Sequence, residues 1–209
     1  MTTTVDYHDF NVANVHASST HVFGKIYILH ANTPLILNSP LLRVPFGLSE
    51  FTNYGKTTYS LNLSFHDDND ENVTIMKNRM QSLDIVMMEL AVKNSGEWFK
   101  KNLSREEVEK MYKPICKPSN NPSYASTFRV KVKQHANGTV LTDMFNITSG
   151  SKCTINEIQK GCFAEINVSL SPLWIVNNTF GISLIAERIA IDEKPIERAA
   201  KNFKFLEED

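Results

Sequence analysis

An alternation of apolar and cationic residues between Tyr124 and Gln134 constrains the fold of this chain more than any other feature. The alternating residues are Phe128, Arg129, Val130, Lys131, Val132 and Lys133. Their two-residue period is that of a β-strand, so we expect one face to close a core and the other to present a row of positive charge. Such a face suits a polyanion. The alternative is a solvated strand that carries Lys and Arg only for solubility.

Charge is segregated along a chain whose total charge is balanced. The 209 residues are 42% hydrophobic, enough to bury the core of one domain, and the formal net charge is -1. Residues 98–133 nevertheless hold nine Lys or Arg and three Glu, whereas residues 66–97 hold seven acids and three bases. A one-sided electric field can therefore exist on a nearly neutral protein.

Cysteine usage and the N-terminal sequence predict the compartment. Cys116, Cys153 and Cys162 are an odd number and form no Cys-x-x-Cys pair, which argues against a disulfide framework and a zinc site. The N-terminus has no basic region followed by an apolar run, and no stretch has the length of a membrane span. We expect a soluble, intracellular protein without a membrane partner.

Hydrophobic periodicity and turn residues predict an α+β fold that is mostly β. Predicted strands cover residues 23–30, 57–65, 139–147, 162–170, 173–176 and 180–191, with turns at 53–55, 137–138 and 177–178. An apolar stripe from Val73 to Leu90 predicts a helix at about residues 73–92, and the Ser104/Glu107 capping box predicts a short one ending near Tyr112. We expect a mostly antiparallel sheet, long enough to curl into a small barrel, with helix 73–92 closing one end.

The chain divides into three parts on this interpretation. Residues 1–22 are polar and aperiodic, which predicts a flexible N-terminal arm; residues 23–191 form the folded domain; residues 192–209 form a mixed-charge to acidic C-terminal tail.

Motifs for catalysis are absent from the sequence. There is no phosphate loop, Gly-rich dinucleotide turn, His-Glu-x-x-His or Gly-x-Ser-x-Gly. Asp68, Asp70 and Asn72 resemble the start of a calcium loop, but Val73 replaces the required Gly and Arg79 the bidentate Glu. We therefore expect no enzyme activity, no metal and no cofactor. An alternative, an enzyme that uses the acids of residues 66–71 with a metal, predicts activity that a chelator abolishes.

Basic residues interleaved with aromatic ones indicate binding of single-stranded nucleic acid. Cations follow the phosphates and flat side chains stack on bases. The candidate phosphate contacts are Lys25, Lys56, Lys100, Lys101, Lys113, Arg129, Lys131 and Lys133. The candidate stacking residues are Tyr27, Tyr54 and Trp98, while Tyr59, Phe65, Phe128 and Trp174 are assigned to the core.

Three segments carry a family resemblance. They are the run Pro40-Leu41 to Pro45-Phe46-Gly47-Leu48-Ser49, the strand Tyr59–Phe65 with a helix after it, and the strand Phe180–Leu184. Together they resemble the single-stranded-DNA-binding proteins of nucleocytoplasmic large DNA viruses, which are similar to the replication single-strand binder of short-tailed phages. The resemblance implies an OB-fold barrel capped by a helix, non-catalytic coating of single-stranded DNA, and a homodimer.

The resemblance also implies a role for the C-terminal tail. In the family an acidic tail occupies the DNA groove or contacts replication partners, here a polymerase, helicase or primase. The matching residues are Phe203, Phe205, Glu207, Glu208 and Asp209, although this tail is shorter and less acidic than the family's tails.

Together with the basic and aromatic residues, the resemblance implies a protein of viral DNA replication, recombination or repair, acting in the cytoplasm or nucleus of a host cell. The alternative is a structural or assembly β-protein, such as a virion component or scaffold. It predicts protein partners and an apolar stripe from Met76 to Leu90 that is partly exposed.

Overall fold

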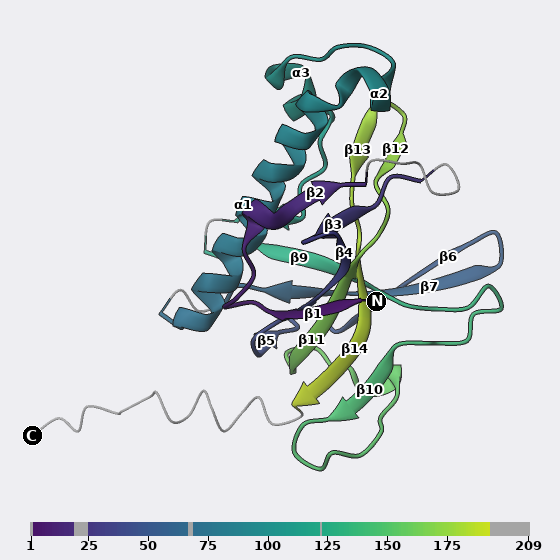
Figure 1. Cartoon of the computed structure of the whole chain (residues 1–209). Coiled ribbons are helices and arrows are strands. Elements are labelled where there is room, and N and C mark those ends of the chain that lie inside the picture. The colour runs from purple at the N-terminus through teal and green to yellow at the C-terminus, as the bar shows by residue number, and fades with distance from the viewer. Residues whose placement is uncertain (1, 19–24, 67–68, 122, 193–209) are drawn as a thin grey trace, which may run out of the picture.

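A large mixed sheet with three α-helices forms the part of the chain that the computed structural model describes, residues 2–18, 25–66, 69–121 and 123–192 (Figure 1). The strands are β1 (Thr3–Asp6), β2 (Val15–Ala17), β3 (Ile28–His30), β4 (Thr33–Asn38), β5 (Leu42–Arg43), β6 (Leu48–Asn53), β7 (Lys56–Ser64), β8 (Cys116–Lys117), β9 (Thr127–Val132), β10 (Asp143–Asn146), β11 (Phe163–Leu170), β12 (Trp174–Val176), β13 (Thr179–Gly181) and β14 (Leu184–Asp192). The helices are α1 (Glu71–Lys93), α2 (Ser95–Phe99) and α3 (Arg105–Met111), and the 3-10 turns are η1 (Val12–Asn14) and η2 (Ile155–Glu157). The expected α+β, mostly β class is confirmed.

Five strands of the large sheet pair in a closed ring. β14 pairs in parallel with β9, and antiparallel pairs then lead from β9 to β7, β5 and β11, which returns to β14. The remaining parallel pairs join β1 to β4 and β10 to β14, while the other pairs are antiparallel. A ring leaves its members without exposed edges, and it fixes β9 between β7 and β14.

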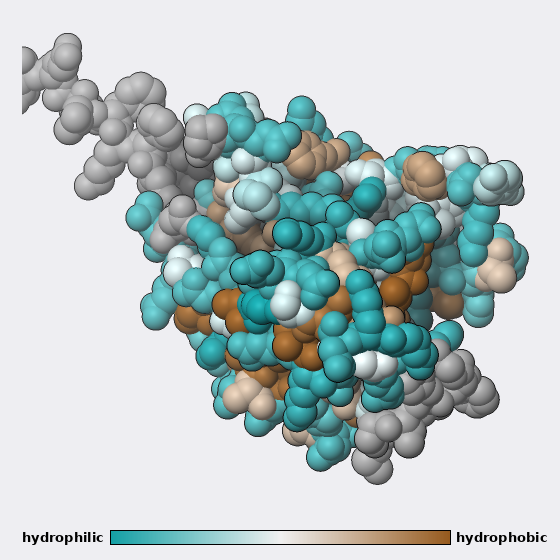
Figure 2. All heavy atoms as spheres, turned by 90° about the horizontal axis from the view of Figure 1, so that it is seen from above, coloured by the Kyte–Doolittle hydropathy of each residue, from teal (hydrophilic) through white to brown (hydrophobic). Residues whose placement is uncertain are grey.

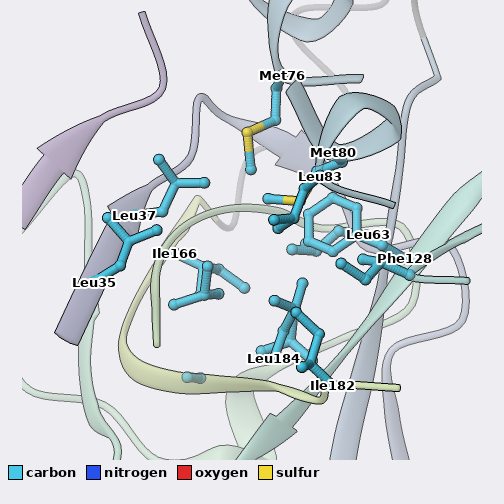
Figure 3. Packing of buried hydrophobic residues seen from close by; sticks show 14 of the residues in the cluster. Leu35, Leu37, Leu63, Met76, Met80, Leu83, Phe128, Ile166, Ile182 and Leu184 are labelled. Atoms are coloured by element: carbon cyan, nitrogen blue, oxygen red, sulfur yellow. The ribbon is translucent and has the colours of Figure 1, made fainter. Parts of the chain in front are cut away.

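Helix α1 closes the core of this ring. Asp70 caps the helix, because its carboxylate accepts from the backbone N–H groups of Asn72 and Val73. The predicted stripe is buried except for Leu90, which is partly buried, and Figure 3 shows Met76, Met80 and Leu83 directed at apolar side chains from the strands. Those strand residues are Leu35, Leu37, Leu63, Phe128, Ile166 and Leu184. The helix prediction is confirmed, with two more residues at the start and one at the end.

Two tight hairpins follow the turn residues in the sequence. Tyr54 and Gly55 join β6 to β7 with φ angles of 47° and 74°, and Asn177 and Asn178 join β12 to β13 with φ angles of 48° and 56°. Positive φ at both loop residues produces a turn whose twist matches that of the strands. The β6–β7 hairpin projects from the sheet in Figure 1.

The N-terminal residues differ from the expected flexible arm. Strand β1 pairs in parallel with β4, β2 pairs with β3, and Phe10 between them is fully buried. The segment is polar because it needs only a few apolar anchors: its backbone groups are satisfied by strands distant in the sequence. Its lack of periodicity therefore did not indicate a loose arm.

The predicted hairpin at Asn137-Gly138 is only partly correct. The turn forms, since Gly138 N–H donates to His135 O and His135 N–H donates to Thr139 O. The following strand, β10, pairs with β14 and not with β9. Thr142 connects this part of the chain to β14, because its hydroxyl donates to Ala186 O at 2.7 Å and accepts from Lys133 N–H at 2.8 Å.

None of the helices in the described ranges is both long enough and apolar enough to cross a bilayer. The tail predictions fall on residues 193–209, outside the described residues.

Candidate nucleic-acid interface

Strand β9 divides its side chains between core and surface as its alternation predicts. Phe128, Val130 and Val132 are buried, whereas Arg129 and Lys131 are exposed. The Arg129 Nε donates to the hydroxyl of Ser60 on the neighbouring β7 at 3.0 Å, which fixes the guanidinium against the sheet. The sheet itself therefore sets the position of these two cations.

Other cations reach the same surface from distant parts of the chain. Arg129 and Lys131 line two adjoining hollows, one shared with Lys113 and Lys117 and the other with Lys56. We call this surface the basic groove, defined by Lys56, Lys113, Lys117, Arg129 and Lys131. None of the described residues that line these hollows is acidic, and none of the described carboxylates forms a salt bridge with the five cations.

Aromatic side chains also line the basic groove. Trp174 of β12 borders the hollow with Lys113 and Lys117, whereas Phe51 and Tyr59 border the hollow with Lys56. Phe51 is 62% exposed, an unusual exposure for a phenylalanine that serves only the core. Tyr54 is fully exposed at the tip of the β6–β7 hairpin, beside Lys56. Cations and flat side chains thus occur together, as single-strand binding requires.

A buried carboxylate holds the segment that carries Lys113 and Lys117. Asp84, on the apolar stripe of α1, accepts from the Tyr112 hydroxyl at 2.6 Å, from Ile115 N–H at 2.7 Å and from Cys116 N–H at 3.1 Å. Burial raises the pKa of Asp84, although these hydrogen bonds oppose the rise. Burial beside this carboxyl group likewise raises the pKa of Tyr112 and holds its hydroxyl as a donor.

Lys133 occupies a different environment from Arg129 and Lys131. Its Nζ donates to the Glu187 carboxylate at 2.6 Å, and it lines neither hollow of the groove. Burial opposes ionisation of Glu187, but hydrogen bonds from Lys133 and Ser169 outweigh it and lower the pKa of this carboxyl group. The charge of Lys133 is therefore largely balanced at neutral pH.

The structure places the remaining predicted residues away from the two hollows. Lys25, Lys100 and Lys101 are exposed but line neither hollow, and Tyr27 is half-buried. Trp98 is only 8% exposed in α2 and packs edge-on against Phe99, so it has little face to offer a base. Its indole belongs to the core, which corrects the prediction for this residue.

Four residues that line the groove, Phe51, Tyr59, Lys117 and Trp174, were not among the sequence candidates, and Tyr59 and Trp174 had been assigned to the core. Lys117 lies in the two-residue strand β8, within a Pro- and Asn-rich sequence without periodicity, and Trp174 lies in a three-residue strand too short to define its faces. For Phe51 a local signal existed, because it lies on a short hairpin with charged and polar neighbours.

Metal chemistry finds no support among the described residues, where no group of three or more His, Cys, Asp or Glu side chains could hold an ion. Asp68 of the calcium-like segment lies outside the described residues, and Asp70 is occupied as the cap of α1.

Comparison with solved structures finds proteins that bind single-stranded DNA. The chain is similar to gp2.5, a single-stranded DNA binding protein encoded by bacteriophage T7, with 15% identity, a TM-score of 0.50, and coverage of 81% of this chain and 98% of that one. This likeness shows a shared fold. The single-stranded DNA-binding protein from bacteriophage Enc34 is also similar, with 12% identity, a TM-score of 0.39, and coverage of 87% of this chain and 92% of that one.

A structure of the Enc34 protein in complex with ssDNA is similar too, with 11% identity, a TM-score of 0.41, and coverage of 87% of this chain and 98% of that one. These neighbours are phage proteins, in line with the phage part of the resemblance, while the assignment to large DNA viruses stays a prediction. No curated protein sequence matches the chain. The model of the Family of unknown function (DUF5871) matches residues 62–207, so the chain belongs to that family.

Proposed function

We propose that this protein binds single-stranded DNA non-catalytically along the basic groove. The observation that carries the proposal is the grouping of five cations from three separate segments on one surface whose described lining contains no carboxylate. Chance solvation of a strand accounts for Arg129 and Lys131 but not for the convergence of Lys56, Lys113 and Lys117 beside them. The fold shared with a single-stranded DNA binding protein of bacteriophage T7 supports the same function.

The chemistry of the groove favours a single strand over a duplex. Lysine and arginine neutralise phosphates and release counterions, which makes binding dependent on salt. The exposed rings of Phe51 and Tyr54 offer faces that only unpaired bases can reach. We further propose that the closed ring of strands is an OB-type barrel, with β9 and β7 as the strands that carry DNA.

We extend this proposal to a role in the replication, recombination or repair of viral DNA, and to a homodimer. The tail would contact a polymerase, helicase or primase through Phe203, Phe205, Glu207, Glu208 and Asp209. The resemblance described above supports this extension. The wider set of cations, including Lys25, Lys100 and Lys101, would then guide the strand outside the groove.

An assembly function receives less support. That alternative requires a partly exposed apolar stripe on α1, yet Met76, Met80 and Met87 are fully buried. Of the stripe only Leu90 is partly exposed, and Ile85, which lies off the stripe, is 48% exposed, so α1 offers a small apolar surface for such a function.

Fluorescence anisotropy of labelled oligo-dT, oligo-rU and a matched duplex tests the proposal. We expect tight binding to oligo-dT that weakens with salt and largely spares the duplex; comparison with oligo-rU decides between DNA and RNA. Absence of binding to both single strands at low salt contradicts the proposed function. Equal affinity for duplex and single strand contradicts the part assigned to the aromatic residues.

A further inference from the structure

One hollow of the basic groove has an apolar floor that phosphate binding does not require. Ile115, Ile182 and Leu184 line it and are each at most 7% exposed, while the indole of Trp174 forms part of its wall. Four of the groove cations surround it: Lys113, Lys117, Arg129 and Lys131. A hydrated phosphate gains nothing from an apolar floor, so the occupant must combine a flat apolar part with negative charge.

Trp174 is held in place by a glycine. A Cβ atom on Gly181, its partner in the β12–β13 hairpin, would lie 2.8 Å from Trp174 Cζ2 and 3.4 Å from Cε2. The indole therefore rests directly on the backbone of β13. The same Cβ atom would lie 3.1 Å from the carbonyl oxygen of Lys113, so Gly181 also allows the cationic segment to approach the hairpin.

The surroundings of the hairpin support an accessible site. Phe180 beside Gly181 is fully buried against Phe99 and Tyr112, which anchors the base of the hairpin. Figure 2, which looks onto the end of the molecule with α2, α3 and this hairpin, shows apolar surface between hydrophilic side chains. Trp174 is only partly buried, so the hairpin presents an accessible indole next to its anchored base.

We propose that this hollow binds one nucleobase of the single strand against Trp174, with the neighbouring phosphates on the four cations around it. The inference rests on the proposed function and assigns to it a base subsite that depends on Trp174 and on Gly181 as its positioning residue. A nucleotide is the occupant that matches both parts of the hollow, since its base is flat and largely apolar and its phosphate is anionic. Stacking on the indole needs no base identity, so the subsite accepts every sequence.

Intrinsic fluorescence isolates this contact, because the chain has two tryptophans. The Trp98→Phe variant retains only Trp174, and the Trp174→Phe variant retains only the buried Trp98. Titration with oligo-dT should strongly quench the emission of Trp98→Phe and leave that of Trp174→Phe unchanged. A second titration of Trp98→Phe uses an oligomer of equal length without bases, which carries the same phosphates and should give binding with little quenching.

Affinity measurements test the energetic part. Trp174→Ala should lower the affinity for oligo-dT by about 5- to 150-fold, the range for loss of one stacked base, while the slope of the salt dependence stays unchanged. Gly181→Ala should displace the indole and reduce both quenching and affinity in the same direction. Circular dichroism melts of each variant establish that it is folded, and Trp174→Ala decides the question if Gly181→Ala does not fold.

The outcomes separate the two proposals. Binding of oligo-dT without quenching of Trp174, together with unchanged affinity of Trp174→Ala, overturns the base subsite and leaves the proposed function standing. Quenching by the oligomer without bases as strong as that by oligo-dT also overturns it. Failure of the wild-type protein to bind at low salt overturns the proposed function, and the subsite with it.

Discussion

The salt dependence of DNA binding should distinguish Lys131 of β9 from Lys133, although Lys133 follows directly after the strand and continues its alternation. Each cation that contacts a phosphate adds about 0.7 to the slope of log affinity against log salt for a single strand, so five groove cations predict a slope of about -3.5. Lys131→Ala should reduce the steepness of this slope by about 0.7. Lys133 is already paired with Glu187 at 2.6 Å and should contribute little.

The matched control removes a lysine without changing the net charge of the protein. The double variant Lys133→Ala/Glu187→Gln deletes both partners of the ion pair, whereas a Lys133→Ala change alone would leave an unpaired carboxylate near the DNA. Anisotropy titrations between 50 and 200 mM salt supply the slopes. Over this range the wild-type affinity should fall by about a hundredfold.

Two results would refute the reasoning behind this prediction. Equal slopes for the wild-type protein and Lys131→Ala would show that the basic groove does not hold the phosphates. A loss of slope in the double variant as large as that in Lys131→Ala would show that the ion pair opens on binding, and that the row of three cations inferred from the sequence is the correct site.

Four further predictions concern stability, turn geometry and thiol chemistry. Asp84→Ala leaves three donors without an acceptor, at a cost of about 1–3 kcal/mol per group with partial relaxation. It should therefore lower the free energy of unfolding by about 3–5 kcal/mol and also weaken DNA binding. Unchanged urea denaturation would contradict this role of Asp84. Phe10→Ala should cost about 3–5 kcal/mol because it empties a fully buried site, whereas a flexible N-terminal arm predicts no change. Tyr54→Asn should raise the free energy of unfolding by about 1 kcal/mol, since Asn tolerates the positive φ of this turn better than Tyr. The same change should lower DNA affinity if the Tyr54 ring stacks on a base. A less stable variant would show that the positive φ of Tyr54 does not strain the backbone. Burial raises the pKa of Cys116 to about 12 and of Cys162 to about 11, so both thiols should react slowly with iodoacetamide at pH 8 until urea unfolds the chain. Rapid labelling of either thiol in the folded protein, distinguished from labelling of Cys153 by peptide mass spectrometry, would contradict this.

Local periodicity and turn chemistry predicted much of the framework. The two faces of β9, the stripe of α1 and the turns at Tyr54-Gly55 and Asn177-Asn178 all appear in the structure. These features depend on backbone geometry within a few residues, and a sequence pattern reports that geometry directly. Long-range pairing was harder to predict, as the strand β10 and the N-terminal strands show.

The candidate site likewise has a part that the sequence predicted and a part that only the tertiary structure decided. The sequence determined that Arg129 and Lys131 face away from the core, because alternate residues of a strand must point to opposite sides. Tertiary packing alone decided that Lys56, Lys113 and Lys117 lie beside these two cations. It also decided that Glu187, 54 residues from Lys133 in the chain, balances the charge of Lys133. Finally, it decided that Trp174 and not Trp98 reaches the groove. These outcomes depend on which distant segments become neighbours when the ring of strands closes, and a local pattern carries no information about that distance in space.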